Sequence, residues 1–288
     1  MTDLSRVCDL HRRRHDLQDP FDSAMLHLVY ATSGRFIEST GESGNFCAKR
    51  HYNSAVRNLD MIVGFNDVRS VQALMLMAVY CLRDPVGAGA WILSRTALLI
   101  AIDHGMHRQT KALSVLSMRT ELRKRLFWAC YSFDRQISIP IGRPFGISDR
   151  DIDIDLPLDI DEETEEPQLA DLDAVLASSS RSSTLTSFLM VVHLRRIESN
   201  IQQTIYRVDR SGGPANSVID EFLAQLEIWK AKIPTDTKHF KDAGDRPFDG
   251  YDYYVCLSLH TLCYGQNTDT DSLFISSSAS DCCFIHRY

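Results

Sequence analysis

Over most of the chain, apolar residues recur at steps of three and four positions, which is the spacing of one face of an α-helix. Residues 52–62 show this pattern, and residues 68–82 repeat it after a capping candidate at Asn66 or Asp67. A further helix is predicted over residues 89–104. Four of its residues share one face: Ile92, Thr96, Leu99 and Ile102. The first part of the chain is therefore predicted to consist of successive amphipathic helices.

The middle of the chain combines a helical pattern with an extended one. Gly105 follows the third segment at the position of a left-handed helix end. A long helix is predicted over 119–139, and the sequence GRP at 142–144 has the composition of a turn. Aspartate and apolar residues then alternate over 149–157. This period of two predicts an extended segment whose isoleucines pack inward while its aspartates face water.

Two more amphipathic segments follow a Ser-rich connection at 177–183. The first covers 185–208, and the second begins near Ser217, a capping candidate. A last apolar stretch at 253–264 predicts another helix, and no β-hairpin or β-α-β pattern is found. The sequence therefore predicts an all-α fold, an orthogonal bundle of about seven or more helices with one extended acidic segment near 149–157.

The same patterns divide the chain into parts. Residues 1–20 are predicted to be a flexible N-terminus, and residues 21–264 one helical domain with an acidic and Ser-rich connection at 158–183. From 265 to 288 the amphipathic pattern is lost abruptly. We interpret this tail as irregular, and as the product of a truncated gene or a misassigned exon boundary.

Composition is typical of a globular protein, with 44% hydrophobic and 24% charged residues. No apolar run is long enough to predict a transmembrane helix. The net charge of −7 conceals an acidic block at 149–173, which holds twelve acidic residues and one basic residue. Such a block repels phosphate, which argues against a nucleic-acid surface there. A solvated loop is the favoured interpretation, and a partner-binding acidic segment is the alternative.

Candidate metal ligands are sparse. The eight cysteines include no C-x-x-C pair, which argues against a zinc finger or zinc cluster formed by this chain. His104 and His107 flank the break at Gly105, so we interpret them as helix-end groups rather than as metal ligands. The aspartates of 149–155 alternate in direction and do not converge as Mg²⁺ ligands must.

Motifs typical of enzymes were not found, namely G-x-G-x-x-G, G-x-x-x-x-G-K-[ST], G-x-S-x-G and H-E-x-x-H. The basic residues at 119–125 are predicted to form the charged face of a packed helix. Arg143 is predicted to bridge its turn to a carboxylate or to helix C-terminal carbonyls. Three tryptophans are predicted to be core residues, with a role in lining a ligand pocket as the alternative: Trp91, Trp128 and Trp229.

Five short elements resemble, in the right order, the fungal-specific transcription factor domain, the middle homology region of fungal zinc-cluster regulators. Residues 101–108 (AIDHGMHR) resemble its A-x-x-x-G-L-H-R stretch, and residues 121–128 (ELRKRLFW) its E-x-x-R-R-x-W-W helix. Residues 133–135 (FDR) resemble its L-D-R element, residues 142–144 its G-R-P turn, and residues 147–157 its I-x-d-x-D-i-d-v-x-L-P segment. The looser helical resemblance covers roughly residues 20–264.

The resemblance implies the regulatory domain of a nuclear, gene-specific transcription regulator of a fungus, without catalytic residues. DNA contact is then expected only through a zinc-cluster module that this sequence lacks or through a partner protein, and no cofactor is expected here. Other expected partners are the transcription machinery or co-regulators and a small-molecule effector, but no membrane. An all-α enzyme or small-molecule-binding protein is the alternative. The resemblance implies structural roles for Gly105, His107, Arg108, Arg125, Trp128, Asp134, Arg135, Gly142, Arg143, Pro144, Asp151 and Pro157.

Overall fold

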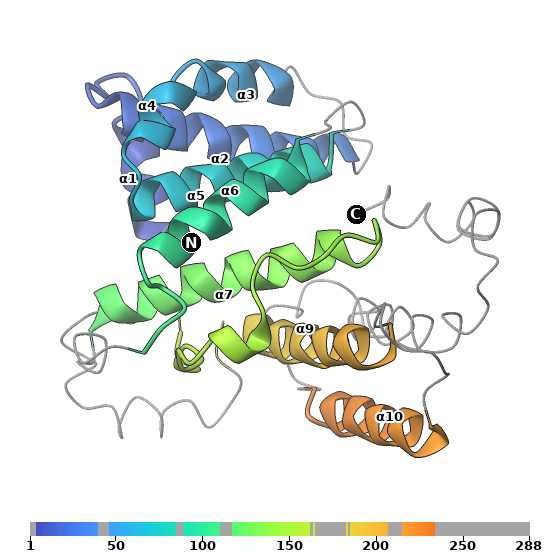
Figure 1. The fold of residues 1–288 in the computed structure, drawn as a ribbon. Helices are drawn as coiled ribbons and strands as arrows, with labels where there is room; N and C mark the ends of the chain where they lie inside the picture. The colour runs from blue at the N-terminus through green and yellow to red at the C-terminus, as the bar shows by residue number, and fades with distance from the viewer. Residues whose placement is uncertain are drawn as a thin grey trace, which may run out of the picture.

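The computed structural model describes residues 4–39, 46–84, 89–109, 117–161, 164, 183, 185–206 and 215–233. Within these ranges the chain forms nine α-helices and one 3-10 turn and contains no β-strand, which confirms the predicted all-α fold. The long helix α7 (Met118–Ser138) lies between helices α1 to α6 on one side and α9 and α10 on the other (Figure 1). The molecule is therefore built as two helical groups on either side of one central helix.

The first helical group contains six helices, and one apolar core unites them with α7. They are α1 (Leu4–Arg12), α2 (Pro20–Ser39), α3 (Ala48–Val56), α4 (Leu59–Gly64), α5 (Val68–Leu82) and α6 (Ala90–Asp103). The predicted cap of α5 is confirmed at Asp67. Its side chain accepts the Arg69 N–H at 2.8 Å, and Ser70 completes a capping box.

The predicted face of α6 is wrong for two of its four residues, which point away from the core, while Ile102 does pack against it. Ile92 and Leu99 are 61% and 66% exposed. The buried residues of α6 include Leu98 and Ile100, but most are small: Ala90, Ser94, Ala97 and Ala101. Small side chains allow two helix axes to approach closely, and α6 packs along α5. Because α6 is apolar on both faces, the spacing of its large residues did not identify the packed one.

Helix α7 is packed on more than one side, and this changes the predicted role of its basic residues. Its N-terminus is capped by Ser117, which accepts the Thr120 N–H at 3.2 Å. The expectation that 119–125 form a charged face is wrong for Arg125, which is only 2% exposed. Glu121 is fully buried on the same helix. The central position of α7 in Figure 1 explains why charged residues of this helix are buried.

Residues 146–158, which we call the strap, follow α7 and contain only one 3-10 turn, Asp149–Asp151. From the end of that turn, exposure alternates as predicted over residues 151–156, and the alternation ends at Pro157. Ile154 is buried, and so is Pro157. The exposed positions are Asp151, Asp153 and Asp155. The extended acidic segment is therefore confirmed over residues 152–157, with its apolar side chains directed into the protein, whereas residues 149–151 form a 3-10 turn instead.

The second helical group is a pair, α9 (Thr186–Ile205) and α10 (Asn216–Ala231). The predicted cap at Ser217 is wrong, because Ala215 occupies the cap position and makes no side-chain hydrogen bond. The pair has a small core of its own: Met190, Leu194, Ile201, Phe222, Leu226 and Trp229. The predicted helix at 253–264, the tail from 265 and most of the connection at 158–183 lie outside the described residues.

Candidate functional site

Three side chains of α7 bind backbone groups of the strap. Arg135 donates to a carbonyl at 2.7 Å, Trp128 donates its indole N–H to a carbonyl at 3.0 Å, and Glu121 accepts an N–H at 2.8 Å. Positions 121, 128 and 135 are seven residues apart and share one face of the helix. Arg135 binds Ile147, Trp128 binds Asp155, and Glu121 binds Leu158. The strap therefore runs antiparallel to α7 over this face.

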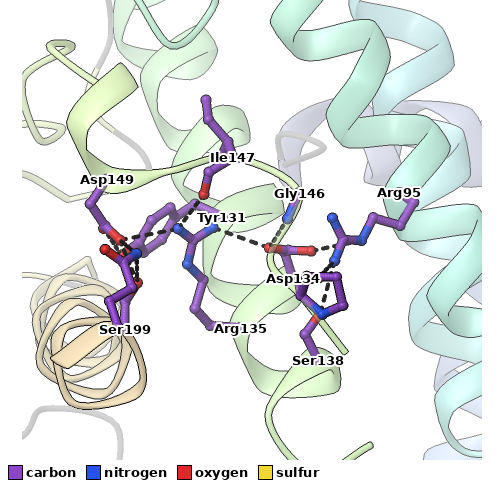
Figure 2. Close-up of polar contacts among 11 residues, drawn as sticks. Arg95, Tyr131, Asp134, Arg135, Ser138, Gly146, Ile147, Asp149 and Ser199 are labelled. Atoms are coloured by element: carbon purple, nitrogen blue, oxygen red, sulfur yellow. Dashed lines mark hydrogen bonds and ion pairs between the residues drawn. The ribbon is translucent and has the colours of Figure 1, made fainter. Parts of the chain in front are cut away.

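Asp134 joins α6, α7 and the start of the strap (Figure 2). Its carboxylate is 3.1 Å from Arg95 Nε and 3.1 Å from Arg135 Nη1, and it accepts the Gly146 N–H at 3.0 Å. Arg95 also donates to Ser138 Oγ at 3.2 Å. Because Asp134 and Arg135 are 1% and 0% exposed, their charges are stabilised by each other and by hydrogen bonds rather than by water.

Asp149 joins the strap and α7 to the second helical group (Figure 2). It accepts the Tyr131 hydroxyl at 2.5 Å and lies 3.3 Å from Arg135 Nη2. From α9, Ser199 and Gln203 donate to the same carboxylate, the latter at 3.0 Å. Burial raises the pKa of Tyr131, and the negative charge of Asp149 raises it further, so the hydroxyl stays protonated as a donor. One carboxylate thus collects donors from two helices.

The turn after α6 holds the far side of the strap. Gly105 has a φ of 61°, which confirms the predicted left-handed helix end. The His107 carbonyl accepts the N–H groups of Asp153 and Ile154, both at 3.2 Å. An exposed ion pair of 3.0 Å between Arg108 and Asp153 joins the same two segments. The stretch at 101–108 and the acidic segment therefore meet in space.

The histidine rings of this turn do not gather around a metal position. His104 donates its Nε2 hydrogen to the Asn66 carbonyl, while its own carbonyl accepts from Arg123. Burial lowers the pKa of His107, and the neighbouring Arg108 lowers it further. Within the described part of the chain, no three His, Cys, Asp or Glu side chains are placed to hold a metal ion together.

The turn at 142–144 completes the start of the strap. Gly142 has a φ of 61°, and the Pro144 carbonyl accepts from Arg95. The predicted bridge from Arg143 to a carboxylate or carbonyl is corrected, because its guanidinium lies 4.1 Å from the centre of the Trp91 ring. A Cβ atom at Gly146 would lie 2.5 Å from Arg95 Nη1. Any larger residue at this position would displace the side chains of Arg95 and Leu98.

The structure brings five of the predicted motif residues into contact with the strap, to which two others belong: His107, Arg108, Trp128, Asp134 and Arg135 contact it, and Asp151 and Pro157 lie on it. Asp151 is exposed, and Arg125 is buried within α7. Arg95 could have been singled out as the one charged residue between the apolar positions of α6 before Asp103. For Asp149, the signal was its place at the start of the alternating segment. Sequence reasoning gave no role in this network to Arg95, Tyr131, Gly146, Asp149 and Ser199.

We call the contacts that join α6, α7 and α9 to the strap, centred on Glu121, Asp134 and Asp149, the clamp. Its buried carboxylates are engaged by arginines, by hydroxyl and amide groups and by backbone N–H groups, and each contact fixes the position of a helix or of the strap. Burial raises the pKa of Cys130 to about 12, which is the opposite of the shift that activates a thiol nucleophile. None of the helices in the described ranges is both long and apolar enough to cross a membrane. The fold and site thus define an all-α domain in which buried polar contacts fix the positions of the helices and the strap.

Comparison with known families identifies this class of domain more closely. The model of the fungal specific transcription factor domain matches residues 19–231, so the chain belongs to that family. The match extends from the start of α2 to the end of α10 and includes the whole clamp. Members of this family regulate transcription and are not enzymes, which agrees with the predicted non-catalytic role.

Several curated proteins are similar to the chain over much of its length. A positive regulator of purine utilization from Emericella nidulans is 24% identical over 255 residues, which cover 71% of this chain and 24% of that protein. Pyrimidine pathway regulatory protein 1 of Saccharomyces cerevisiae is 30% identical over 57% of this chain and 17% of its own length. An ABC-transporter-regulating transcription factor of Aspergillus fumigatus is 28% identical over 68% of this chain and 22% of its own length. The chain thus spans a quarter or less of these relatives, and no solved structure matches it.

Proposed function

We propose that this chain is the regulatory region of a nuclear transcription regulator, and that it acts by binding partners or an effector instead of by catalysis. The observation that carries the proposal is the family match, which extends across both helical groups and the clamp between them. Relatives named as regulators of purine utilization, of a pyrimidine pathway and of ABC transporters support a regulatory role. Nuclear localisation follows from that role.

DNA contact is proposed to come from a zinc-cluster module or from a partner protein. The strap supports this division of labour, because it presents Asp151, Asp153 and Asp155 to solvent. Carboxylates at these positions repel a phosphate backbone. The proposed direct partners of the helical region are co-regulators, the transcription machinery or a small-molecule effector.

The clamp suggests how such a signal is transmitted. Asp149 binds α7 and α9 at once, and its side chain is 22% exposed. A ligand or partner that binds more tightly when α9 is detached from Asp149 would shift the chain toward that state, and a ligand that favours attachment would do the reverse. The second helical group is therefore proposed to be the part whose position changes during regulation.

Tethering the chain to a promoter tests the proposed function. The full chain is fused to an unrelated DNA-binding domain in a fungal host, and expression of a reporter gene is compared with that given by the DNA-binding domain alone. We expect the fusion to change reporter expression several-fold. An Asp149→Asn fusion is expected to alter that change, and an Asp153→Asn fusion, which alters an exposed carboxylate of the same strap, is expected to preserve it.

Two results would contradict the proposal. The first is a reporter level equal to that of the DNA-binding domain alone with the fusion protein present in the nucleus. The second is sequence-specific binding of duplex DNA by the unfused chain at physiological salt, which would assign DNA contact to this region itself.

A further inference from the structure

The outer side of α6 is apolar although it faces solvent. Ile92 and Leu99 are the two most exposed large apolar side chains among the described residues. They are seven positions apart, so they lie on the same side of the helix, separated by about two turns. Between them, the Thr96 hydroxyl donates to the Ile92 carbonyl at 3.0 Å and is thus engaged within the helix. We call Ile92, Thr96 and Leu99 the outer ridge of α6, which offers mainly carbon atoms to solvent.

The turn after α7 lies beside this helix and brings a positive charge to it. Arg95 of α6 donates to the Pro144 carbonyl, which holds the turn against the helix. The Arg143 guanidinium lies over the Trp91 ring, 4.1 Å from its centre. Because Trp91 directly precedes the outer ridge, the charge of Arg143 and the apolar ridge belong to neighbouring parts of one surface.

Arg143 is placed to receive a carboxylate that the described part of the chain does not supply. Its side chain is exposed, and within the described ranges its guanidinium has neither an ion pair nor a hydrogen bond. The left-handed backbone of Gly142, with a φ of 61°, and the ring of Pro144 restrict the turn on both sides of it. A guanidinium held over an aromatic face still directs the N–H groups of its edge outward, and that planar fork matches a carboxylate. The missing partner is therefore a carboxylate from another molecule.

We propose that the outer ridge and Arg143 form one docking surface for an acidic amphipathic helix of a co-regulator, an inference that rests on the regulatory function proposed above. Apolar residues spaced by three or four positions along the partner helix cover Ile92 and Leu99. An Asp or Glu at the edge of the same helix face pairs with Arg143. The apolar contacts supply most of the affinity, and the ion pair selects an acidic partner.

A second copy of this chain fits the docking surface less well than such a helix does. The exposed aspartates of its strap carry the required charge. However, Ile154 of the strap is buried, so the strap presents no apolar side chain beside those aspartates to cover the outer ridge. An amphipathic helix carries both kinds of group on one side, which is what this surface complements.

The probe is a fluorescent synthetic helix with leucines along one face and glutamates at its edges, and a matched peptide has glutamine in place of each glutamate. Anisotropy measures the binding of both peptides to the full chain. We expect the glutamine peptide to bind about fivefold more weakly, because the ion pair lies at an exposed rim. Leu99→Gln is expected to weaken the binding of both peptides about tenfold, because it removes part of the outer ridge.

Arg143→Gln identifies the residue that reads the charge. It should bind the two peptides equally well, whereas Arg150→Gln, at an exposed arginine of the strap, should keep the native preference for glutamate. These three substitutions change exposed side chains, and an unchanged unfolding midpoint of each variant verifies its fold.

Three results would overturn the docking surface. They are no binding of the glutamate peptide, a preference for glutamate that persists in Arg143→Gln, and self-association of the native chain that Leu99→Gln abolishes. The last result would assign the outer ridge to a second copy. The reporter experiment does not depend on these peptides, so failure of the docking surface is distinguishable from failure of the proposed regulatory function.

Discussion

The two helical groups of this domain are held together by different means. The first group has a large apolar core that extends from α1 through α7 and includes part of the strap. Among the described residues, the separate core of the second group contains six buried apolar residues. Its attachment to α7 combines Val192 and Phe188, which pack into the first core, with polar contacts around Asp149. The second group is therefore the less stable part, and its docking is where a small change in free energy has a structural effect.

Asp134 and Asp149, two carboxylates of the clamp, differ in the same way. Asp134 joins the central helix α7 to the first group and is almost fully buried between Arg95 and Arg135. Asp149 acts between the groups, where its side chain is 22% exposed and receives mostly neutral donors. A buried ion pair is costly to break, whereas a partly exposed set of hydrogen bonds can be exchanged for water at small cost.

Asp134→Ala is expected to have the largest effect, because it leaves Arg95 and Arg135 without their shared carboxylate. Removing one partner of a buried ion pair costs about 3–5 kcal/mol, so unfolding of the first group should shift by that amount. Urea denaturation followed by circular dichroism measures the shift. Asp153→Ala, at an exposed ion pair of the same clamp, serves as the control and should cost no more than about 1 kcal/mol. Equal effects of the two substitutions would contradict the burial argument.

Trp229→Ala tests whether the second group unfolds by itself. The indole is 3% exposed and donates to the Met190 carbonyl, so its loss should cost about 3 kcal/mol within a small core. We expect hydrogen exchange of α9 and α10 to accelerate while protection of α5 and α6 is retained. Trp128→Ala, on the central helix α7, should instead lower the protection of α5 and α6 as well. Loss of protection throughout the chain in Trp229→Ala would show that the two groups unfold as one unit.

The local elements of this fold could be predicted from the sequence, and the pairings between distant residues could not. Spacing gave the limits of α7, and glycine in a helix-end context gave Gly105. Strict alternation gave the inward direction of Ile154. In contrast, the Arg95–Asp134 pair joins residues of two helices, and no local pattern records which carboxylate a partly buried arginine meets. The packed face of α6 was hidden because alanine and serine carry little hydrophobic signal, although they pack closely.

The clamp shows the same contrast between local elements, which could be predicted, and long-range contacts, which could not. The resemblance at 101–108 and 147–157 pointed to segments that do meet, because the His107 carbonyl binds the strap. The role of Asp149 depended on the position of α9, about fifty residues further along the chain, which no spacing rule supplies. Arg143 occupied a turn with several partners in reach, and the structure selects the Trp91 ring. Sequence thus located the segments of the site, and tertiary packing determined the contacts between them.

Asp149→Asn sharpens the comparison between the groups, with a smaller expected effect. The substitution keeps the shape of the side chain but removes the charge, which weakens the hydrogen bonds from Tyr131, Ser199 and Gln203. A charge-assisted bond is worth about 1.5–3 kcal/mol and a neutral one about 1, so a loss of about 1–2 kcal/mol is expected. Hydrogen exchange in α9 measures it, with Asp153→Asn as the matched control. Unchanged exchange in α9 would show that the apolar contacts alone hold the second group.

The smallest expected effect is a pH dependence within the first group, at the pair formed by His27 of α2 and His51 of α3, whose Nδ1 atoms are 2.9 Å apart. Burial lowers the pKa of both rings below the usual value near 6.5, so the folded chain binds fewer protons than the unfolded chain. Their contribution to stability is therefore complete above about pH 6.5 and declines as the pH falls from there toward the lowered folded pKa values. Arg50 acts in the same direction on His51.

The measurement is the urea midpoint at several pH values between about 7.5 and 5, for the native chain and for a His27→Gln, His51→Gln double variant. His107 and His193 also have lowered pKa values, so both proteins should lose some stability in acid. The difference between them isolates the pair, and it should be smaller than the effect of Asp149→Asn because both rings are partly exposed to solvent. A steeper loss in the double variant would reverse the assigned sign, and identical slopes would show that the two rings titrate alike in the folded and unfolded chains.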